Sequence, residues 1–499
     1  MKRLLSLFFI VFSTFVQGQI ELSQPDQEQL DRLQNLGNVA SVLLDTVITF
    51  LPNNNIQVSA ENAESINLYF EKFRLVPGSK LSIFDQNHKF VFEYTEQSNS
   101  DGGAFAIPPV KGEKIVLEYS GDLFHSEIVI SQVGYFFKKN EDVQNSGFCQ
   151  VDINCSEGNQ WQDEKKGIIR LLLKKSSTTV YCSGSLMNNT AQDCRPYILS
   201  ADHCIAGVSE SGLEQSIALI NYENKNCNAD VSQSDVALTG LKKRASSNFS
   251  GGSDFLLLEL NEDIPSEYQV YYNGWEMVED TFNSGVSIHH PKGDVKKIST
   301  YSTMLVTPNV DDLLNSAYWE VIWQETNNGH GVTETGSSGA PIFNQRHLVV
   351  GYLSVGLSFC TKPNEPDYYG KLSYAWEESP DSSKRLDVWL DPINTNQTTL
   401  IGSYYPCDDS IPKSEREFIQ NDFQVRFSEH KLHVTMFQNH AKQMVIELIN
   451  LEGKTIVSKR FNSKVIDEYL DLTKLSQGLY FLKITENNRQ RIERFAVFN

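Results

Sequence analysis

Short runs of apolar, β-favouring residues recur along almost the whole chain, and they constrain the fold more than any other feature of the sequence. In the first part they occupy residues 47–51, 67–70, 80–84, 90–94, 114–119 and 126–130. Later runs of the same kind occupy residues 167–173, 179–186, 255–260, 318–323 and 348–353. Turn-forming Gly, Pro, Asn and Asp residues separate the runs. This pattern predicts an all-β protein built of barrels or sandwiches.

Length and charge limit the classes of function. A chain of 499 residues suggests about three domains at roughly 150 residues each. The formal net charge of −20 argues against non-specific nucleic-acid binding, because that binding requires clustered Lys and Arg. After the N-terminus, no apolar run reaches the roughly 18 residues of a transmembrane helix. We therefore expect no nucleic-acid partner and no transmembrane segment.

The first 18 residues have the pattern of a secretory signal peptide. Lys2 and Arg3 are basic, Leu4–Phe15 is apolar, and Gly18 is small enough to precede a signal-peptidase cleavage site. A short membrane anchor is the alternative, but the apolar stretch is too short to span a bilayer. The pattern predicts export.

The chain contains eight cysteines. An even number in an exported protein predicts four disulfides. Zinc binding is the weaker alternative, because no pair has the CxxC spacing.

The distribution of motifs indicates three β-rich domains. Residues 19–140 contain no cysteine and no evident catalytic set; we interpret them as an antiparallel β-sandwich and a pro-domain, with a binding module or a folding aid as alternatives. Residues 141–405 contain seven of the eight cysteines and all the candidate chemistry. Residues 406–416 are polar and are interpreted as a linker before a third β unit at residues 417–499.

Three short stretches place a histidine, an aspartate and a serine beside β-type runs. They are YILSADHC (197–204), GGSDFLLLEL (251–260) and GSSGAP (336–341). The chain order His203, Asp254, Ser338 is that of chymotrypsin-like proteases and differs from the orders of α/β-hydrolases and subtilisins. A serine hydroxyl needs a base that takes its proton, and the base needs an acid that fixes its tautomer. The backbone N–H groups of Gly336 and Ser338 are the expected oxyanion hole.

Further stretches of the central region occur in the order and with the spacing of a known family. They are GFCQVDINC (147–155), CSGSLMNNTAQD (182–193), SDFLLLELN (253–261), GVSIHHP (285–291), GVTETGSSGAPI (331–342), DYYG (367–370) and RLDVWLDP (385–392). With them, residues 147–395 resemble the lysyl endopeptidase family of bacterial trypsin-like serine proteases. The resemblance implies a chymotrypsin-like double β-barrel with Ser338 as nucleophile, His203 as general base and Asp254 as its orienting partner.

Residue 337, just before the expected nucleophile, is a serine. In some relatives an aspartate at this place pairs with a newly freed N-terminus, so we do not expect activation by that ion pair here.

The resemblance also implies the substrate pocket. Asp367 corresponds to the aspartate at the base of the family's primary pocket, which predicts cleavage after lysine, with arginine left open. Ser354 and Gly356 lie in a stretch that corresponds to the substrate-pairing strand of trypsin-like proteases. The lysine-selective members carry a histidine at the position of Ser354 and a tryptophan on a loop that corresponds here to residues 307–316, and this sequence has neither.

Three disulfides follow from the same resemblance: Cys149–Cys360, Cys155–Cys227 and Cys182–Cys204. Cys194 and Cys407 are left over, and we predict a fourth bond between them. His289 and His290 have the sequence of a metal pair, but adjacent residues of a strand point to opposite faces. No metal and no cofactor are expected.

The last domain resembles the sorting domain of type IX secretion cargo. The matching stretches are VIELINLEGK (445–454) and DLTKLSQGLYFLKI (471–484). This implies recognition by an outer-membrane secretion machinery of a Gram-negative bacterium, followed by release or attachment to the cell surface. A purely structural β-sandwich is the alternative.

The sequence therefore predicts a secreted serine endopeptidase that acts on proteins or peptides through an acyl-enzyme. A catalytically inert surface adhesin or binding protein with a protease fold is the alternative, and a serine esterase is disfavoured because GSSGA (336–340) is not a G-x-S-x-G elbow. Lys138 and Lys139 precede the protease domain, which leads to the hypothesis that the enzyme removes its own leader there.

Overall fold

A computed structural model of the protein describes residues 19–23, 25–26, 28, 38–42, 48–49, 55–137, 146–229, 236–311 and 313–407, and, towards the C-terminus, residues 423–428, 431–437, 444–450, 453–461, 465–471, 475, 478–486 and 489–497. The expected signal peptide, the dilysine at 138–139 and most of the expected linker lie outside the described residues. The contacts divide the chain into two compact units, Met1–Cys407 and Asp408–Asn499.

The N-terminal part of the first unit is a sandwich of two β-sheets. One sheet has the order β1 (Gln19–Leu22), β4 (Ile56–Ala60), β10 (Lys114–Ser120), β6 (Lys80–Phe84) and β7 (Phe90–Tyr94). The other contains β2 (Asn38–Val42), β11 (Glu127–Phe137), β5 (Ala63–Arg74) and β8 (Phe105–Ala106), with β3 (Ile48–Thr49) beside β11 and β9 (Val110–Lys111) beside β5. Alternate residues of both sheets, such as Val58, Ile83 and Phe70, enter one apolar core.

The first barrel of the central domain follows the N-terminal sandwich. Its strands have the order β17 (Val236–Thr239), β16 (Ile217–Ile220), β13 (Ile168–Lys174), β14 (Thr178–Met187), β15 (Tyr197–Ala201), β19 (Phe255–Leu260) and β18 (Leu241–Ser246). The two end strands are joined through Gly240, whose φ of 95° suits glycine. Leu171, Ile198 and Leu258 share one core with residues of the other strands, so the sheet curls around its own apolar face.

The second barrel contains β23 (Lys297–Tyr301), β22 (Gly285–His289), β25 (Pro341–Asn344), β26 (Val349–Gly356), β27 (Asp367–Lys371) and β24 (Tyr318–Val321), in that order. Beyond β23 lies β12 (Val151–Asp152). Beside β26 lies β21 (Trp275–Glu276), which in turn pairs with β28 (Thr399–Leu400). A bond from the Gln324 amide to the Thr300 carbonyl (2.8 Å) connects the segment after β24 to β23 and closes the barrel. A third core, which includes Phe255 and Tyr352, fills the space between the barrels.

The remaining elements of the first unit are short. They include the helices α2 (Glu210–Glu214), α3 (Leu372–Trp376) and α4 (Asp387–Leu390) and the strand pair β20 (Tyr271–Tyr272) and β29 (Ser403–Tyr404). Among the described residues, no helix is long and apolar enough to span a membrane.

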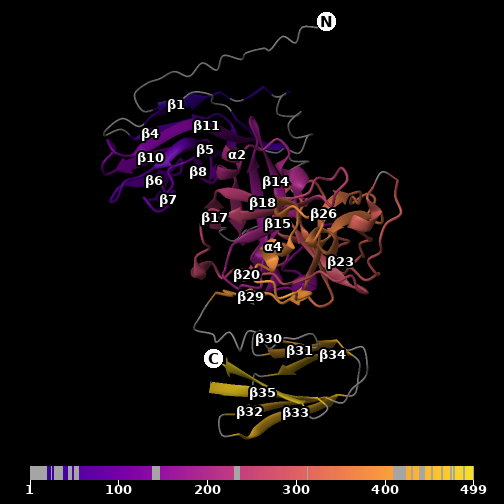
Figure 1. Cartoon of the computed structure of the whole chain (residues 1–499). Helices are drawn as coiled ribbons and strands as arrows, with labels where there is room; N and C mark the ends of the chain where they lie inside the picture. The colour runs from indigo at the N-terminus through magenta and orange to yellow at the C-terminus, as the bar shows by residue number, and fades with distance from the viewer. Residues whose placement is uncertain are drawn as a thin grey trace. The chain divides into compact units, whose positions relative to one another are not determined.

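The N-terminal sandwich and the first barrel share a sheet. Strand β2 pairs with β11 on one side and with β14 on the other, so that Ser41 lies opposite both Tyr135 and Thr178. Figure 1 shows the indigo and purple strands of the sandwich beside the first barrel. Polar contacts support this junction: the Gln215 side chain donates to the Phe70 carbonyl (2.9 Å) and the Thr239 hydroxyl donates to the Ala106 carbonyl (2.9 Å).

The second unit has two sheets. One contains β30 (Phe423–Ser428), β31 (Lys431–Phe437) and β34 (Val465–Asp471); the other contains β33 (Thr455–Phe461), β32 (Met444–Asn450), β35 (Gly478–Glu486) and β36 (Arg489–Val497). Ile446, Leu448 and Leu482 of the second sheet are buried. The predicted all-β fold, with two β-barrels between β-sandwiches, is therefore confirmed.

Four disulfides stabilise the first unit. They are Cys149–Cys360, Cys155–Cys227, Cys182–Cys204 and Cys194–Cys407. These are the three pairs that the resemblance implies and the fourth pair predicted from the remaining cysteines. No cysteine is left to bind zinc.

Candidate active site

The register of β15 and β19 brings His203 and Asp254 together. The strands are antiparallel, with Ala201 opposite Phe255, so the residues just after β15 and just before β19 meet. The Asp202 amide donates to the Asp254 carbonyl at this point (2.8 Å). A 3₁₀ turn, Asp202–Ile205, then presents the His203 side chain.

The buried Asp254 carboxylate holds the His203 ring. His203 Nδ1 lies 2.7 Å from Asp254 Oδ2, and the His203 amide donates to Asp254 Oδ1 (3.0 Å). Nδ1 must carry the proton in this pair because an ionised carboxylate only accepts. The other ring nitrogen is then unprotonated in the neutral ring, and the side chain is 39% exposed while Asp254 is fully buried. A ring in this state can accept a proton from a neighbouring hydroxyl.

The backbone around Asp254 is held in an unusual conformation. Its φ of 62° lies in the left-handed region, which surrounding contacts must stabilise in a non-glycine residue. The Tyr352 hydroxyl donates to the Ser253 carbonyl (3.1 Å), and the Ser253 hydroxyl donates to a carboxylate oxygen of Glu378 (2.5 Å). The segment before β19 is thus anchored from the second barrel side.

The loop that carries Ser338, residues 332–339 (the Ser338 loop), packs against the end of β15. The Ser183 amide donates to the Ser338 carbonyl (2.8 Å) and the Ser183 hydroxyl donates to the Gly336 carbonyl (2.9 Å). Gly339 comes so close to β15 that a Cβ on it would lie 2.1 Å from Ser200 Oγ. These contacts bring Ser338 next to the turn that carries His203. The hydrogen bonds of the described residues do not include one from the Ser338 hydroxyl to the His203 ring.

The backbone of the Ser338 loop leaves two amides available. Gly336 has a φ of 95° and Gly339 a φ of 81°, values that favour glycine. Among the hydrogen bonds of the described residues, none is donated by the amides of Gly336 or Ser338. Two unused N–H groups, one of them on Ser338 itself, are an arrangement that can bind an oxyanion.

Asp367 is a buried carboxylate surrounded by five neutral donors. Oδ1 accepts from the amides of Leu357 (2.7 Å) and Ser358 (2.8 Å). Oδ2 accepts from the hydroxyls of Ser358 (2.7 Å) and Thr333 (2.8 Å) and from the indole of Trp323 (2.6 Å). No ion pair of the described residues involves Asp367, so its charge lacks a cation inside the protein. The five hydrogen bonds stabilise the buried charge, and no cation of the described residues neutralises it.

Ser354 and Gly356 lie on β26 but differ in what they contact. The Ser354 hydroxyl donates to Asp254 Oδ2 (2.6 Å), so this side chain supports the aspartate. The predicted pairing with substrate concerns the backbone of its strand and stays a prediction. A Cβ on Gly356 would lie 2.5 Å from Thr333 Oγ1 and 3.6 Å from Asp367 Oδ1. Glycine is therefore favoured at this position, because a side chain would clash with Thr333 beside Asp367.

The central part of the chain matches a known family. Residues 143–370 match the family model described as "Lysyl endopeptidase, C-terminal domain". This part of the chain is similar to the lysyl endopeptidase family. A lysyl endopeptidase of Pseudomonas aeruginosa is 27% identical over 329 residues, which cover 61% of this chain and 68% of that protein. The predicted resemblance to this family of serine proteases is thereby confirmed.

Residues 426–497 match the model of a secretion system C-terminal sorting domain. The predicted sorting domain is confirmed, and it indicates a secreted or cell-surface protein that a secretion machinery handles.

Solved structures also match the chain. The protease Anisep of Arthrobacter nicotinovorans is 14% identical with a TM-score of 0.31, covering 41% of this chain and 90% of that one. A mutant of human heparin binding protein is 13% identical with a TM-score of 0.31, covering 47% of this chain and 93% of that one.

Several contacts of the central domain have no signal in the sequence. Ser183, Trp323 and Glu378 hold the Ser338 loop, Asp367 and the Asp254 segment, respectively. Only Ser183 lies in a stretch that carried the resemblance, and nothing there indicated its partners. The pair His289 and His290 does not form a metal site: His289 contacts two serines and His290 Nδ1 contacts the Asp294 carbonyl (2.9 Å). Among the described residues, no cluster of metal-binding side chains is present.

Proposed function

We propose that this protein is a secreted serine endopeptidase that hydrolyses peptide bonds after lysine. The single observation that supports it most is the pairing of the exposed His203 ring with the buried Asp254 carboxylate, beside the Ser338 loop. In this proposal Asp254 fixes the proton of His203 on Nδ1, and the unprotonated Nε2 is the base.

The reaction begins when Ser338 Oγ attacks the carbonyl carbon of the substrate and His203 Nε2 takes the hydroxyl proton. The carbonyl oxygen becomes an oxyanion, which the amides of Gly336 and Ser338 bind. His203 then gives its proton to the leaving amine, the C–N bond breaks, and an acyl-enzyme remains. A water molecule, deprotonated by His203, attacks the ester carbonyl and restores the Ser338 hydroxyl.

Asp367 selects the residue before the cleaved bond. The carboxylate is fully buried and has only neutral donors around it, so a cationic side chain would supply the missing charge. Lysine is the proposed residue on the basis of the family, and arginine is the second cation to test.

The domain organisation belongs to the same proposal. Residues 1–18 are the signal peptide, residues 19–140 a pro-domain, residues 141–405 the protease and residues 417–499 the sorting domain after a linker at 406–416. The pro-domain is removed near Lys138 and Lys139 by the enzyme itself. N-terminal sequencing of the mature protein, and of a Ser338→Ala chain, tests this: cleavage that persists in the variant contradicts self-processing.

The decisive experiment compares peptide amide reporters that end in Lys, Arg, Leu or Glu, with the Ser338→Ala chain as control. We expect turnover of the Lys reporter that the variant loses completely. Turnover of both the Lys and the Arg reporters would show that the enzyme also accepts arginine before the cleaved bond. A fluorophosphonate should label Ser338 in the wild-type chain; a correctly folded chain that is neither labelled nor active would favour the inert adhesin or binding protein instead.

A further inference from the structure

A buried histidine lies beneath the Ser338 loop. His289 is the last residue of β22 and is completely buried. Its Nδ1 lies 2.7 Å from Ser337 Oγ, and its Nε2 lies 3.1 Å from Ser299 Oγ. The proposed catalytic steps do not use this ring, although Ser337 is the direct neighbour of Ser338.

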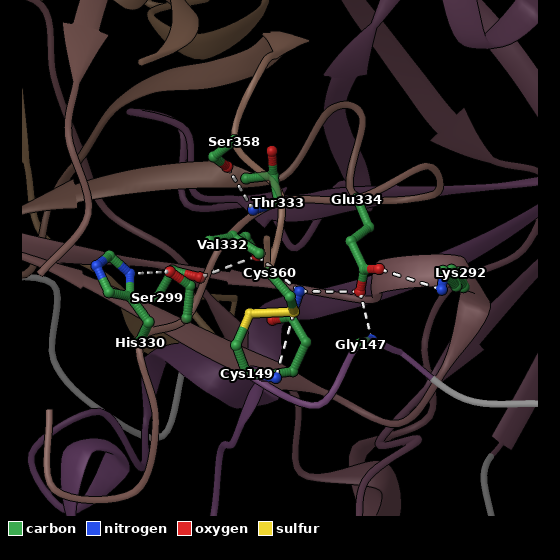
Figure 2. The surroundings of a disulfide bond; sticks show 12 residues. Gly147, Cys149, Lys292, Ser299, His330, Val332, Thr333, Glu334, Ser358 and Cys360 are labelled. Carbon is green, nitrogen blue, oxygen red and sulfur yellow. Dashed lines mark hydrogen bonds and ion pairs between the residues drawn. A yellow bond between two sulfur atoms is a disulfide. The ribbon is translucent and has the colours of Figure 1, made fainter. Parts of the chain in front are cut away.

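The surrounding donors determine the direction of these hydrogen bonds. The Glu334 amide donates to Ser337 Oγ (3.1 Å), so the Ser337 hydroxyl proton is available for His289 Nδ1. On the other side the Ser299 hydroxyl donates to the Val332 carbonyl (3.3 Å), which Figure 2 shows. Ser299 Oγ therefore accepts the proton of His289 Nε2. Every donor in this path has an acceptor only when the ring is neutral and protonated on Nε2.

The path begins and ends in the same loop. It runs from Ser337 through His289 and Ser299 to the Val332 carbonyl, and so it connects the two ends of the segment that contains Thr333 and Gly336. Thr333 contacts the pocket carboxylate and Gly336 contributes an unused amide. A single ring thus sets the separation between the pocket side and the oxyanion side of the loop.

The ring performs this role without charge. Burial, together with nearby Lys297, lowers the pKa of His289 to about 3. The ring is therefore neutral at the pH values at which proteins fold and act. Because the His289 ring is neutral, it needs no counter-ion. The Ser337 hydroxyl is also neutral, so it needs no cation to pair with it, whereas an aspartate at this position would.

A second anchor holds the middle of the loop from the outside. The Glu334 carboxylate accepts from the Gly147 amide (2.8 Å) and the Gln150 side chain (3.0 Å), and it pairs with Lys292 (3.2 Å). Figure 2 shows Glu334 between Gly147 and Lys292. These contacts act on the Glu334 carboxylate, whereas the Ser337 hydroxyl contacts His289 and the Glu334 amide.

We propose that His289 is a positioning residue that assembles the oxyanion hole, so that the Ser338 loop is in its active geometry before the N-terminal domain is removed. The inference rests on the proposed function. In this chain, which carries its N-terminal domain, the amides of Gly336 and Ser338 are already unused and the loop is held through Ser337. No freed N-terminus is needed at residue 337.

The test compares His289→Asn and Ser337→Ala with His290→Gln in the full chain. The His290 side chain is equally buried, but its Nδ1 contacts the Asp294 carbonyl instead of the loop, so this variant controls for the loss of a buried ring. Asparagine keeps an acceptor near the place of Nδ1. For each chain we would measure kcat and KM for the Lys reporter, the rate of fluorophosphonate labelling, and Tm.

We expect kcat and the labelling rate to fall together by roughly tenfold or more for Ser337→Ala, because misplaced oxyanion donors weaken binding of the transition state. For His289→Asn, kcat and the labelling rate should fall less. For His290→Gln, both should stay within twofold of wild type, and Tm should be comparable. The uncleaved wild-type band should be labelled as fast as the processed band.

Other results would overturn the inference. If Ser337→Ala folds and keeps kcat within twofold of wild type, or if His290→Gln loses as much, His289 does not position the loop. Labelling confined to the processed band would mean that the loop forms only after cleavage. An inactive and unlabelled wild-type chain would instead overturn the proposed function, and the inference with it. The two failures are distinguishable, because this one is seen in the wild-type chain without any variant.

Discussion

The indole of Trp323 donates a hydrogen bond to Asp367 Oδ2 over 2.6 Å, across 44 residues of sequence. It is the largest of the side chains that contact the carboxylate, and it approaches from the end of β24 while Asp367 begins β27. Trp323 is almost fully buried. The Asp367 carboxylate, which we propose lies at the base of the substrate pocket, is therefore oriented by a rigid ring of the second barrel as well as by its own neighbouring loop.

Trp323→Phe should weaken selection of lysine. The substitution removes one hydrogen bond to a charged group, worth about 1.5–3 kcal/mol, and keeps most of the aromatic volume. We expect kcat/KM for the Lys reporter to fall by about tenfold while the Leu reporter stays at its low level. Trp319→Phe is the matched control, because that indole donates to the Val350 carbonyl (3.2 Å) and not to the pocket. Equal effects of both variants on the Lys reporter would argue against this role of Trp323.

Asp367→Asn should remove most of the preference for a cation. The amide has nearly the shape of the carboxylate but no charge, and losing one member of a buried charge pair costs about 2–5 kcal/mol. We expect kcat/KM for the Lys reporter to fall by about 100-fold or more, mostly through KM, with the fluorophosphonate labelling rate nearly unchanged. Unchanged turnover of the Lys reporter by this variant would show that the pocket carboxylate lies elsewhere.

Ser354→Ala and Ser358→Ala should affect different kinetic constants. Ser354 donates to Asp254 (2.6 Å) and Ser358 donates to Asp367 (2.7 Å). Each change removes a hydrogen bond to a buried carboxylate, worth about 1.5–3 kcal/mol. We expect Ser354→Ala to lower kcat by up to about tenfold with little change in KM, and Ser358→Ala to raise KM for the Lys reporter. Steady-state kinetics of the two variants side by side will tell whether the two carboxylates have separate roles.

Lys174 lies at the junction between the N-terminal sandwich and the first barrel and should make the stability of the folded chain depend on pH. Its Nζ is buried, donates to the Ser176 carbonyl (3.1 Å) and lies 4.9 Å from the centre of the Tyr69 ring. Burial lowers the pKa of Lys174 from 10.5 to about 8. Between these two values the unfolded chain binds the proton that the folded chain has released, so stability attributable to Lys174 should rise with pH from about 8.

Urea unfolding of the full chain at about pH 7 and about pH 9, roughly one unit either side of that pKa, measures this rise. Lys174→Met should be relatively more stabilising at the lower pH, because it removes the buried charge. Lys175→Met controls for the loss of a lysine from the same turn. A difference between wild type and Lys174→Met that does not change with pH would contradict the prediction.

The sequence by itself determined the all-β class, the order of His203, Asp254 and Ser338, and the sorting domain. Turn residues and β-favouring runs act locally. The order of the motifs along the chain does not depend on the structure of the segments between them. Three of the cysteine pairs followed from the family resemblance, and the fourth was predicted from the two cysteines that the resemblance left over.

Only the tertiary structure decided which polar groups support these residues. His289 reaches Ser337 because β22 pairs with β25, and Trp323 reaches Asp367 because β24 pairs with β27. The same holds for β2, which joins the N-terminal sandwich to the first barrel through β14. A buried histidine, tryptophan or serine has many possible partners in a sequence, and strand register selects one of them. Burial then makes the selected hydrogen bond indispensable, since an unpaired polar group inside a protein is costly.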